Sequence, residues 1–462
     1  MLVMRKSFFL IVTFAFFAKA DCQELPAFKV LRYEEDYSFL RPDSSRENWY
    51  SQTKFKPLAK GKKSYLTFGG ELRYQYFYFK NEGWGKEPED KDGYILNRYL
   101  GHVDFHAGKY FRTFVQLQSS LNGGKTAAPS PVDENQLDLH QAFIDVVPLL
   151  KPRQSLTVRV GRQELLYGSQ RLVSVRDGPN NRQSFDAARV IYQVGQFRVD
   201  GFYSYYVLSK LKIFDDGFNK NTKFWGAYSV INNLPFLQHA DVYYLGLWKA
   251  AGVFDDGSRR ELRHSIGTRI WGKSKNLLYD FEGLCQWGEF GTGTISAWTL
   301  SSNITYIIPS MKFTPQVNLK TELISGDRNS NDNQLNTFNP LFPRGAYFGY
   351  AAIIGPANLT DIHPSVIFSL TNKLDFSFDY DAFWRYSSRD GIYDPAVNLI
   401  YSGKNVPGKF IGQQYSTFIV YNPNNYLYFR GEFTWFKAGD FLKAAGPGKD
   451  ISFAGITTQL KF

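Results

Sequence analysis

The chain ends on the stretch Ser452-Phe453-Ala454-Gly455-Ile456-Thr457-Thr458-Gln459-Leu460-Lys461-Phe462, which alternates in polarity and stops on an aromatic ring. Because successive side chains of a β-strand point to opposite faces, one face would carry Ala454, Ile456, Leu460 and Phe462. The other face would carry Gly455, Thr457, Gln459 and Lys461. Such a strand needs an apolar environment on one side and water on the other. The pattern, with its terminal aromatic residue, is typical of the closing strand of a membrane β-barrel.

The same alternation recurs from Ser64 to the end of the chain. Between Leu66 and Tyr78 one face is aliphatic or aromatic, whereas the other carries Thr67, Glu71, Arg73 and Gln75, which indicates lipid outside and water inside. About 18 such segments can be counted, too many for a side-chain-filled core, so we expect an aqueous channel. They lie near residues 65, 95, 110, 137, 156, 185, 197, 223, 241, 263, 278, 295, 313, 363, 374, 411, 426 and 452. The predicted fold class is an all-β, antiparallel transmembrane β-barrel over residues 64–462.

The connections between these segments differ in length. Those at 81–93, 123–136, 171–183, 326–361 and 389–409 are too long for tight hairpin turns, and in membrane barrels the long loops are extracellular. We expect some of them to fold back as lids. A soluble β-sandwich is the alternative, but that fold spans only about 100 residues and has no reason to end on an aromatic strand.

The first 20 residues are typical of a secretory signal peptide. Arg5 and Lys6 precede an apolar run and an Ala-Lys-Ala cleavage site, and the run of about 12 residues is shorter than the roughly 20 that span a bilayer. Cys22 follows Asp21, which disfavours lipidation. Residues 21–63 lack clean alternation, so we expect this segment to lie in the periplasm or inside the barrel. The predicted location is the outer membrane of a Gram-negative bacterium, in contact with its lipid.

The composition fits this location. Aromatic residues make up 17% of the chain, which is consistent with aromatic girdles at the membrane interfaces. The mean hydropathy is only −0.34 because strands with one apolar and one polar face average to a low value. The chain has 54 basic and 43 acidic residues, and the three basic residues in the leader leave a net charge of +8 after it. A basic excess favours anionic partners, either a polysaccharide or small anions. No nucleic-acid module is present, so nucleic acid is not an expected partner.

The polar phase of the strands carries a set of basic residues that we expect to line the pore. Guanidinium groups bind carboxylates through paired hydrogen bonds and stay charged at any relevant pH, so the set should draw anions into the lumen. The residues are Arg73, Arg98, Arg112, Arg159, Arg189, Arg198, Arg269, Lys320, Arg385, Arg430 and Lys461. Acidic residues share this phase, so pairing across strands, which only stiffens the wall, is the alternative for any single arginine. They are Glu71, Asp104, Asp200, Asp280, Glu282, Glu322, Asp375, Asp379, Asp381 and Glu432.

Other constellations carry less chemistry. His102 and His106 would lie about 13 Å apart on a strand, too far to ligate one metal ion. The loop from Asp327 resembles a calcium loop but lacks the required glycine, and Phe338 occupies the position of the bidentate glutamate. The sequence has no nucleophile elbow. We therefore predict no catalytic residue, no metal site and no cofactor; an outer-membrane lipid hydrolase is the enzyme alternative.

Three ordered motifs resemble the alginate export family of outer-membrane barrels. They are Gly69-Gly70-Glu71-Leu72-Arg73, the run from Arg159-Val160-Gly161-Arg162-Gln163-Glu164 through Gly168 to Arg176–Asp186, and the stretch from Ser325-Gly326-Asp327 to Phe342-Pro343. The resemblance covers nearly all of the chain after the leader. It implies an 18-stranded monomer with an arginine-rich constriction, which passes a polyuronate outward by diffusion, with periplasmic secretion partners. It also implies an extracellular and a periplasmic loop that cover the pore.

The resemblance places Arg73, Arg162 and Arg189 on motif positions of the family. Strict alternation puts Arg162 on the lipid side with Val160, so either a bulge turns it inward or it lies at the rim. Two functions remain open at this point. The first is a loop-gated channel for an anionic polysaccharide; the second is an anion-favouring porin that takes up small acidic sugars or nutrients, which the same arginines would serve.

Overall fold

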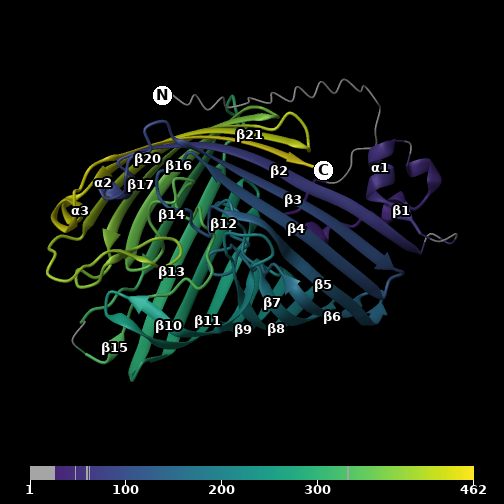
Figure 1. Ribbon diagram of the computed structural model, residues 1–462, viewed down its shortest axis with the longest axis horizontal. Helices are drawn as coiled ribbons and strands as arrows, with labels where there is room; N and C mark the ends of the chain where they lie inside the picture. Colours follow the sequence, from purple (N-terminus) through teal and green to yellow (C-terminus); the bar gives the residue numbers. More distant parts are fainter. Residues whose placement is uncertain (1–26, 47, 59–60, 62, 330–331) are drawn as a thin grey trace, which may run out of the picture.

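The computed structural model describes residues 27–46, 48–58, 61, 63–329 and 332–462 and folds into a closed antiparallel β-barrel of 18 strands (Figure 1). The predicted signal peptide, residues 1–20, and Cys22 lie outside the described residues. The barrel strands are β2 (Ser64–Lys80), β3 (Tyr94–Ala107), β4 (Phe111–Gly123), β5 (Asn135–Lys151), β6 (Gln154–Gln163), β7 (Phe185–Val194), β8 (Phe197–Leu208), β9 (Gly217–Leu234), β10 (Gln238–Phe254), β11 (Gly257–Ser274), β12 (Leu277–Phe290), β13 (Gly293–Ile307), β14 (Gln316–Ile324), β16 (Leu359–Thr371), β17 (Leu374–Arg385), β20 (Phe410–Tyr421), β21 (Leu427–Ala438) and β22 (Ile451–Lys461).

The last strand closes the barrel against the first. β2 pairs with β3 on one side and with β22 on the other, with Arg73 opposite both Arg98 and Gln459. Phe462 extends the seam, since its backbone N–H donates to the Gly70 carbonyl at 3.0 Å and its carbonyl accepts from the Gly70 N–H at 2.8 Å. The seam leaves no strand edge in lipid, where unpaired backbone groups would be costly. The predicted fold class and strand number are confirmed.

The alternation predicted from the sequence sets the two surfaces of the wall. In β22, Thr457 and Gln459 are buried towards the lumen, whereas Ile456 is exposed on the outside. In β2, Arg73 is buried and Tyr74 exposed. A two-residue period therefore determines which side chains can reach a solute in the pore.

The two ends of the barrel differ in the length of their connections. Short turns at 108–110, 152–153 and 195–196 join strands at the end where the C-terminus and α1 (Trp49–Lys54) lie (Figure 1). The long connections lie at the other end, at 81–93, 124–134, 164–184, 209–216, 325–358, 386–409 and 439–450. In membrane barrels the short turns are periplasmic and the long loops extracellular. The connections 209–216 and 439–450 were not predicted.

Short elements complete the fold. Three 3-10 turns (Arg32–Glu34, Ser38–Leu40 and Asp43–Ser45), α1 and β1 (Lys56–Pro57) precede the barrel; the others lie in the long connections. These are α2 (Glu82–Gly85), β15 (Gln334–Leu335), β18 (Ile392–Tyr393), β19 (Leu399–Tyr401) and α3 (Asp440–Ala445). α1 starts after Asn48, whose side chain accepts a hydrogen bond from the Ser51 N–H at 2.8 Å. Within the described part of the chain, no helix is both long and apolar enough to cross a membrane.

Two extracellular connections fold into the lumen and narrow it. We call residues 164–184 the first inserted loop and residues 332–358 the second inserted loop. They meet where Phe342 exchanges backbone hydrogen bonds with Leu172 (2.9 Å) and Ser174 (3.0 Å). The ring of Phe342 packs against Phe185 and Phe224 on the wall, with ring centroids 5.0 and 4.9 Å away. The apolar contacts hold both loops inside the barrel, as expected for some of the long connections.

Candidate functional site: an arginine row in the lumen

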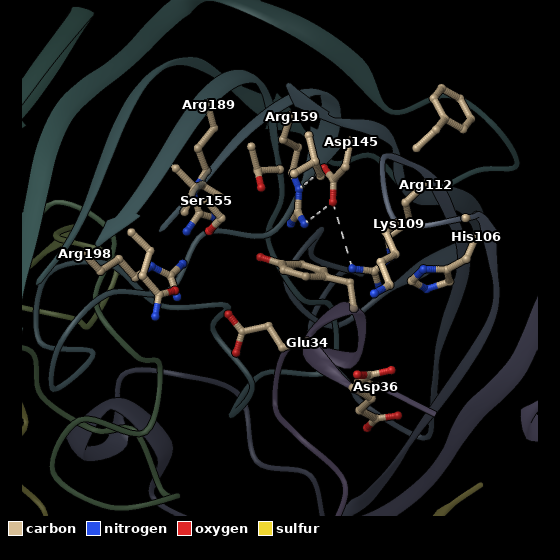
Figure 2. Close-up of a pocket in the computed structure, with 18 of the residues that line it drawn as sticks. Glu34, Asp36, His106, Lys109, Arg112, Asp145, Ser155, Arg159, Arg189 and Arg198 are labelled. Carbon is tan, nitrogen blue, oxygen red and sulfur yellow. Dashed lines mark hydrogen bonds and ion pairs between the residues drawn. The ribbon is translucent and has the colours of Figure 1, made fainter. Parts of the chain in front are cut away.

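Four arginines on neighbouring strands line a cavity of about 460 Å³ in the periplasmic half of the lumen (Figure 2). They are Arg112 on β4, Arg159 on β6, Arg189 on β7 and Arg198 on β8, and we call them the arginine row. Each lies on the inward phase of its strand, as the alternation predicted. The cavity lining includes Lys109 in the turn before β4, and in total six basic and four acidic side chains.

Aspartates on the wall hold most of the row in place. Arg112 binds Asp104 through two hydrogen bonds of 2.7 and 2.6 Å, and Arg159 binds Asp145 in the same bidentate way at 2.7 and 2.8 Å. The remaining two arginines, Arg189 and Arg198, share Asp200. The expected cross-strand pairing therefore occurs, and it fixes the guanidinium groups in a defined geometry.

The alternation of acid and base is interrupted at one place in the row. Arg159 and Arg189 are directly opposite each other on β6 and β7. Like charges in such a position repel, so an acceptor group between them would be favourable. The Arg159 guanidinium lies between the rings of Tyr33 and Phe143, and its Nη1 is buried, whereas Arg198 keeps 37% of its side chain exposed. The row can thus offer N–H donors to an anion.

A second pair of opposed arginines shows what such an acceptor can be. Arg73 and Arg98 face each other on β2 and β3, and both bind the first inserted loop. Arg73 donates to the carbonyls of Asp177 (2.6 Å) and Pro179 (2.7 Å), and Arg98 donates to the Asp177 carboxylate (2.6 Å). Burial alone would raise the pKa of Asp177, but the three cations Arg98, Arg182 and Arg73 lower it below its ordinary value. Arg73 and Arg98 therefore anchor a loop, and neither lines the cavity.

Other predicted pore residues also fix loops. Lys320 lies 4.6 Å from the ring centroids of both Tyr347 and Phe348 in the second inserted loop. Arg430 lies 3.8 Å from the ring of Tyr350. Arg385 is almost fully buried and donates to backbone carbonyls of the connection 386–409. These three cations stabilise the extracellular loops inside the barrel.

The last three predicted residues lie away from the cavity. Arg269 binds Asp280 at 2.6 Å and lies over the ring of Trp271. Arg162 binds Asp186, its register partner on β7, at 2.9 Å. Since Asp186 alternates with buried Phe185 and Ala187, the pair lies on the outward phase near the extracellular end of β6, the rim position of the two alternatives. Lys461 is half-buried beside Glu71 and Asp177.

Several charged residues inside the barrel were not identified from the sequence. Arg171 binds Glu282 and Glu322 (3.5 and 3.2 Å), and Arg182 binds Glu164 (2.7 Å). Both arginines lie in the first inserted loop, where no strand period predicts the direction of a side chain. The Arg176–Asp186 motif includes Arg182, whereas Arg171 lies outside it.

One group of carboxylates in the described residues has the spacing of a metal site: Asp138, Asp215 and Asp216, with ligand atoms within 4.8 Å of one another. They lie at the extracellular end of β5 and in the connection before β9. Burial, with the charge of Asp138, raises the pKa of Asp216 to about 6. Asp216 accepts hydrogen bonds from Asn135 at 3.0 Å, so internal donors already satisfy part of the group.

Comparisons with known proteins agree with this fold. Residues 64–452 match the alginate export family model, and no curated protein sequence matched. A BenF-like porin from Pseudomonas fluorescens Pf-5 is similar in structure, with a TM-score of 0.58 at 9% identity over 86% of this chain and 98% of that chain. OccAB1 of Acinetobacter baumannii has a TM-score of 0.57 at 11% identity, covering 89% of this chain and 99% of that chain.

A third similar structure is OpdK of Pseudomonas aeruginosa with vanillate, with a TM-score of 0.55 at 9% identity over 86% of this chain and 98% of that chain. At such identities these likenesses concern the fold alone. The family match spans nearly the whole barrel and includes the three motifs quoted above. The chain therefore belongs to the alginate export family, and its fold is that of outer-membrane porins.

Proposed function

We propose that the protein is a passive channel that selects anionic solutes at the arginine row and that its solute is an anionic polysaccharide of the polyuronate type, exported outwards. The observation that carries the proposal is the opposition of Arg159 and Arg189 on the wall of a water-accessible cavity. A carboxylate there would relieve the repulsion between the two guanidinium groups and could accept hydrogen bonds from the exposed Arg198. Each sugar of a polyuronate carries one carboxylate, so the polymer could pass the row unit by unit.

A second candidate is uptake of small acidic solutes. A cavity of about 460 Å³ falls within the roughly 300–1,000 Å³ of small-molecule sites, and the two inserted loops narrow the path beyond it. The similar structure of OpdK was determined with vanillate, which is also a carboxylate. The same arginine row would serve either solute, so the candidates differ in whether a polymer can traverse the lumen.

Charge selection can be tested by swelling of liposomes that contain the purified barrel. Galacturonate and galactose are matched in size and differ in charge, so the proposal predicts faster entry of galacturonate. Arg198→Gln should reduce this difference, whereas Arg260→Gln should not, because Arg260 lies exposed at the extracellular rim, paired with Glu289. Equal entry of the two sugars would refute charge selection.

Polymer passage can be tested by current block with oligouronates in a planar bilayer. If the polymer traverses the channel, the block should last longer with chain length and become shorter as the driving voltage rises. If the oligomer only enters and returns, a higher driving voltage should lengthen the block. The second result would favour the small-acid candidate.

A further inference from the structure

The N-terminal segment, residues 27–46 and 48–58, enters the periplasmic mouth of the barrel and is attached to the closing seam. The Arg32 side chain is only 4% exposed. Its Nη1 donates to the Gly70 carbonyl at 2.8 Å, its Nη2 donates to the Phe462 carbonyl at 2.9 Å, and its Nε binds Glu35 at 2.7 Å. One residue therefore fastens the segment to the first and last strands of the barrel.

Tyr33 connects the N-terminal segment to the arginine row. Its ring packs against Phe143, with ring centroids 5.2 Å apart, and the guanidinium of Arg159 lies 4.2 Å from the centre of the Tyr33 ring. The Tyr33 hydroxyl donates to the carbonyl of Glu164 in the first inserted loop at 2.9 Å. The segment thus connects the seam, the row and an extracellular loop, and it occupies space that a solute would need.

Glu34 follows directly and presents its carboxylate to the cavity. Unlike its neighbours Arg32 and Tyr33, Glu34 is exposed, and it is part of the cavity lining together with the arginine row. Figure 2 shows its carboxylate on the side of the cavity that carries Arg189 and Arg198, whereas Asp36 lies further from them. The charge of Glu34 is near enough to interact with Arg198. Glu34 makes no direct ion pair with the row within the described residues, so the arginine donors are not consumed.

The lumen contains a second opposed arginine pair that meets an acidic residue of an inserted segment. At the opposed pair Arg73 and Arg98, the acceptor is Asp177 of the first inserted loop. At the opposed pair Arg159 and Arg189, the N-terminal segment brings Glu34 into the lining of the same cavity. The carboxylate of Asp177 is already bound by Arg98, whereas the arginine row faces a cavity that could admit a solute carboxylate.

We propose that the N-terminal segment is a plug whose docking opposes solute binding, because the Glu34 carboxylate repels a solute carboxylate in the cavity at the arginine row. This inference rests on the proposed anion selection at the row. Solute binding and docking of the segment then weaken each other, so the affinity for a carboxylate is lower while the segment is docked. By reciprocity, a bound carboxylate weakens docking of the segment by the same factor.

The test compares Glu34→Gln, which keeps the size of the side chain, and Arg32→Met, which removes the attachment to the seam, with wild type in planar bilayers. The half-blocking concentration of glucuronate should fall about fourfold in Glu34→Gln, as expected for one charge about 5 Å from the solute in water. Single-channel conductance should rise in Arg32→Met. Asp36→Asn is the matched control on the same segment, and its effect should be smaller.

Hydrogen exchange gives a second readout on the same variants. Glucuronate should accelerate amide exchange at residues 31–34 of the wild-type protein, and the neutral sugar glucose should not. Unchanged exchange with glucuronate, or equal effects of Glu34→Gln and Asp36→Asn on block, would overturn the plug. If Arg198→Gln also leaves block unchanged, the proposed anion selection fails as well; if Arg198→Gln weakens block while the segment variants do not, only the plug fails.

Discussion

Removing the charge of Arg198 should weaken carboxylate binding in the lumen without unfolding the wall. Arg198 is the most exposed member of the arginine row, and the buried Arg189 keeps its ion pair with Asp200 when Arg198 is replaced by glutamine. Replacing Arg189 instead would disturb a buried pair, which typically costs about 3–5 kcal/mol when one partner is removed. Arg198→Gln therefore removes one positive charge from the cavity and leaves the buried Arg189–Asp200 ion pair in place.

The size of the effect follows from the cavity. A volume of about 460 Å³ corresponds to a sphere of about 5 Å radius, so a carboxylate at its centre gains about 0.8 kcal/mol from one wall charge in a water-like dielectric. The half-blocking concentration of glucuronate should therefore rise about fourfold in Arg198→Gln at low salt. Because the Debye length falls from about 30 Å at 0.01 M to about 3 Å at 1 M, the difference should nearly vanish in 1 M KCl.

The assay is current block by glucuronate in planar bilayers at several salt concentrations, with Arg260→Gln as the exposed control outside the lumen. A change that persists unaltered in 1 M KCl would indicate a conformational effect and contradict the electrostatic reasoning. The absence of any change at 0.01 M KCl would show that the solute does not approach Arg198.

Three further predictions concern the segments inside the barrel. Burial, aided by Arg32, lowers the pKa of Lys54 to about 7, so the docked N-terminal segment favours the neutral form of Lys54. Docking of the segment should therefore strengthen by up to about tenfold per pH unit between pH 7 and about 10. Single-channel conductance should fall over this range in wild type and stay level in Lys54→Met. Arg73→Met removes two charge-assisted hydrogen bonds to the first inserted loop, each worth about 1.5–3 kcal/mol, and limited proteolysis should cut the loop faster than in Arg260→Met. Phe342→Ala should cost about 3–5 kcal/mol of packing between the inserted loops and raise single-channel conductance; unchanged conductance would mean that these loops do not narrow the path.

The barrel could be predicted because its signal is local and repeated. A two-residue period distinguishes the lumen face from the lipid face in each strand, so the sequence alone predicts that Arg112, Arg159, Arg189 and Arg198 point inward. The same rule put Arg162 on the outward phase, and its partner Asp186 lies there too. The family motif alone pointed to a pore role for Arg162, whereas the alternation described its surroundings better.

What could not be predicted depends on contacts between distant parts of the chain. The opposition of Arg159 and Arg189 requires the register of β6 against β7, which the 21-residue first inserted loop between these strands does not reveal. The roles of Arg73 and Tyr33 depend on a loop more than 100 residues away in the sequence. No period relates such residues, so a strand pattern shows that a side chain faces the lumen but not whether a loop covers it.

The sign of the reversal potential under a KCl gradient tests the central claim most directly. The cavity at the arginine row has six basic and four acidic side chains, so the reversal potential of the wild-type channel should be shifted towards the equilibrium potential of chloride. The double variant Arg198→Gln with Lys109→Gln removes two positive charges from the cavity. It should shift the reversal potential towards the equilibrium potential of potassium. A potassium-selective wild-type channel, or a double variant with the selectivity of wild type, would contradict the account.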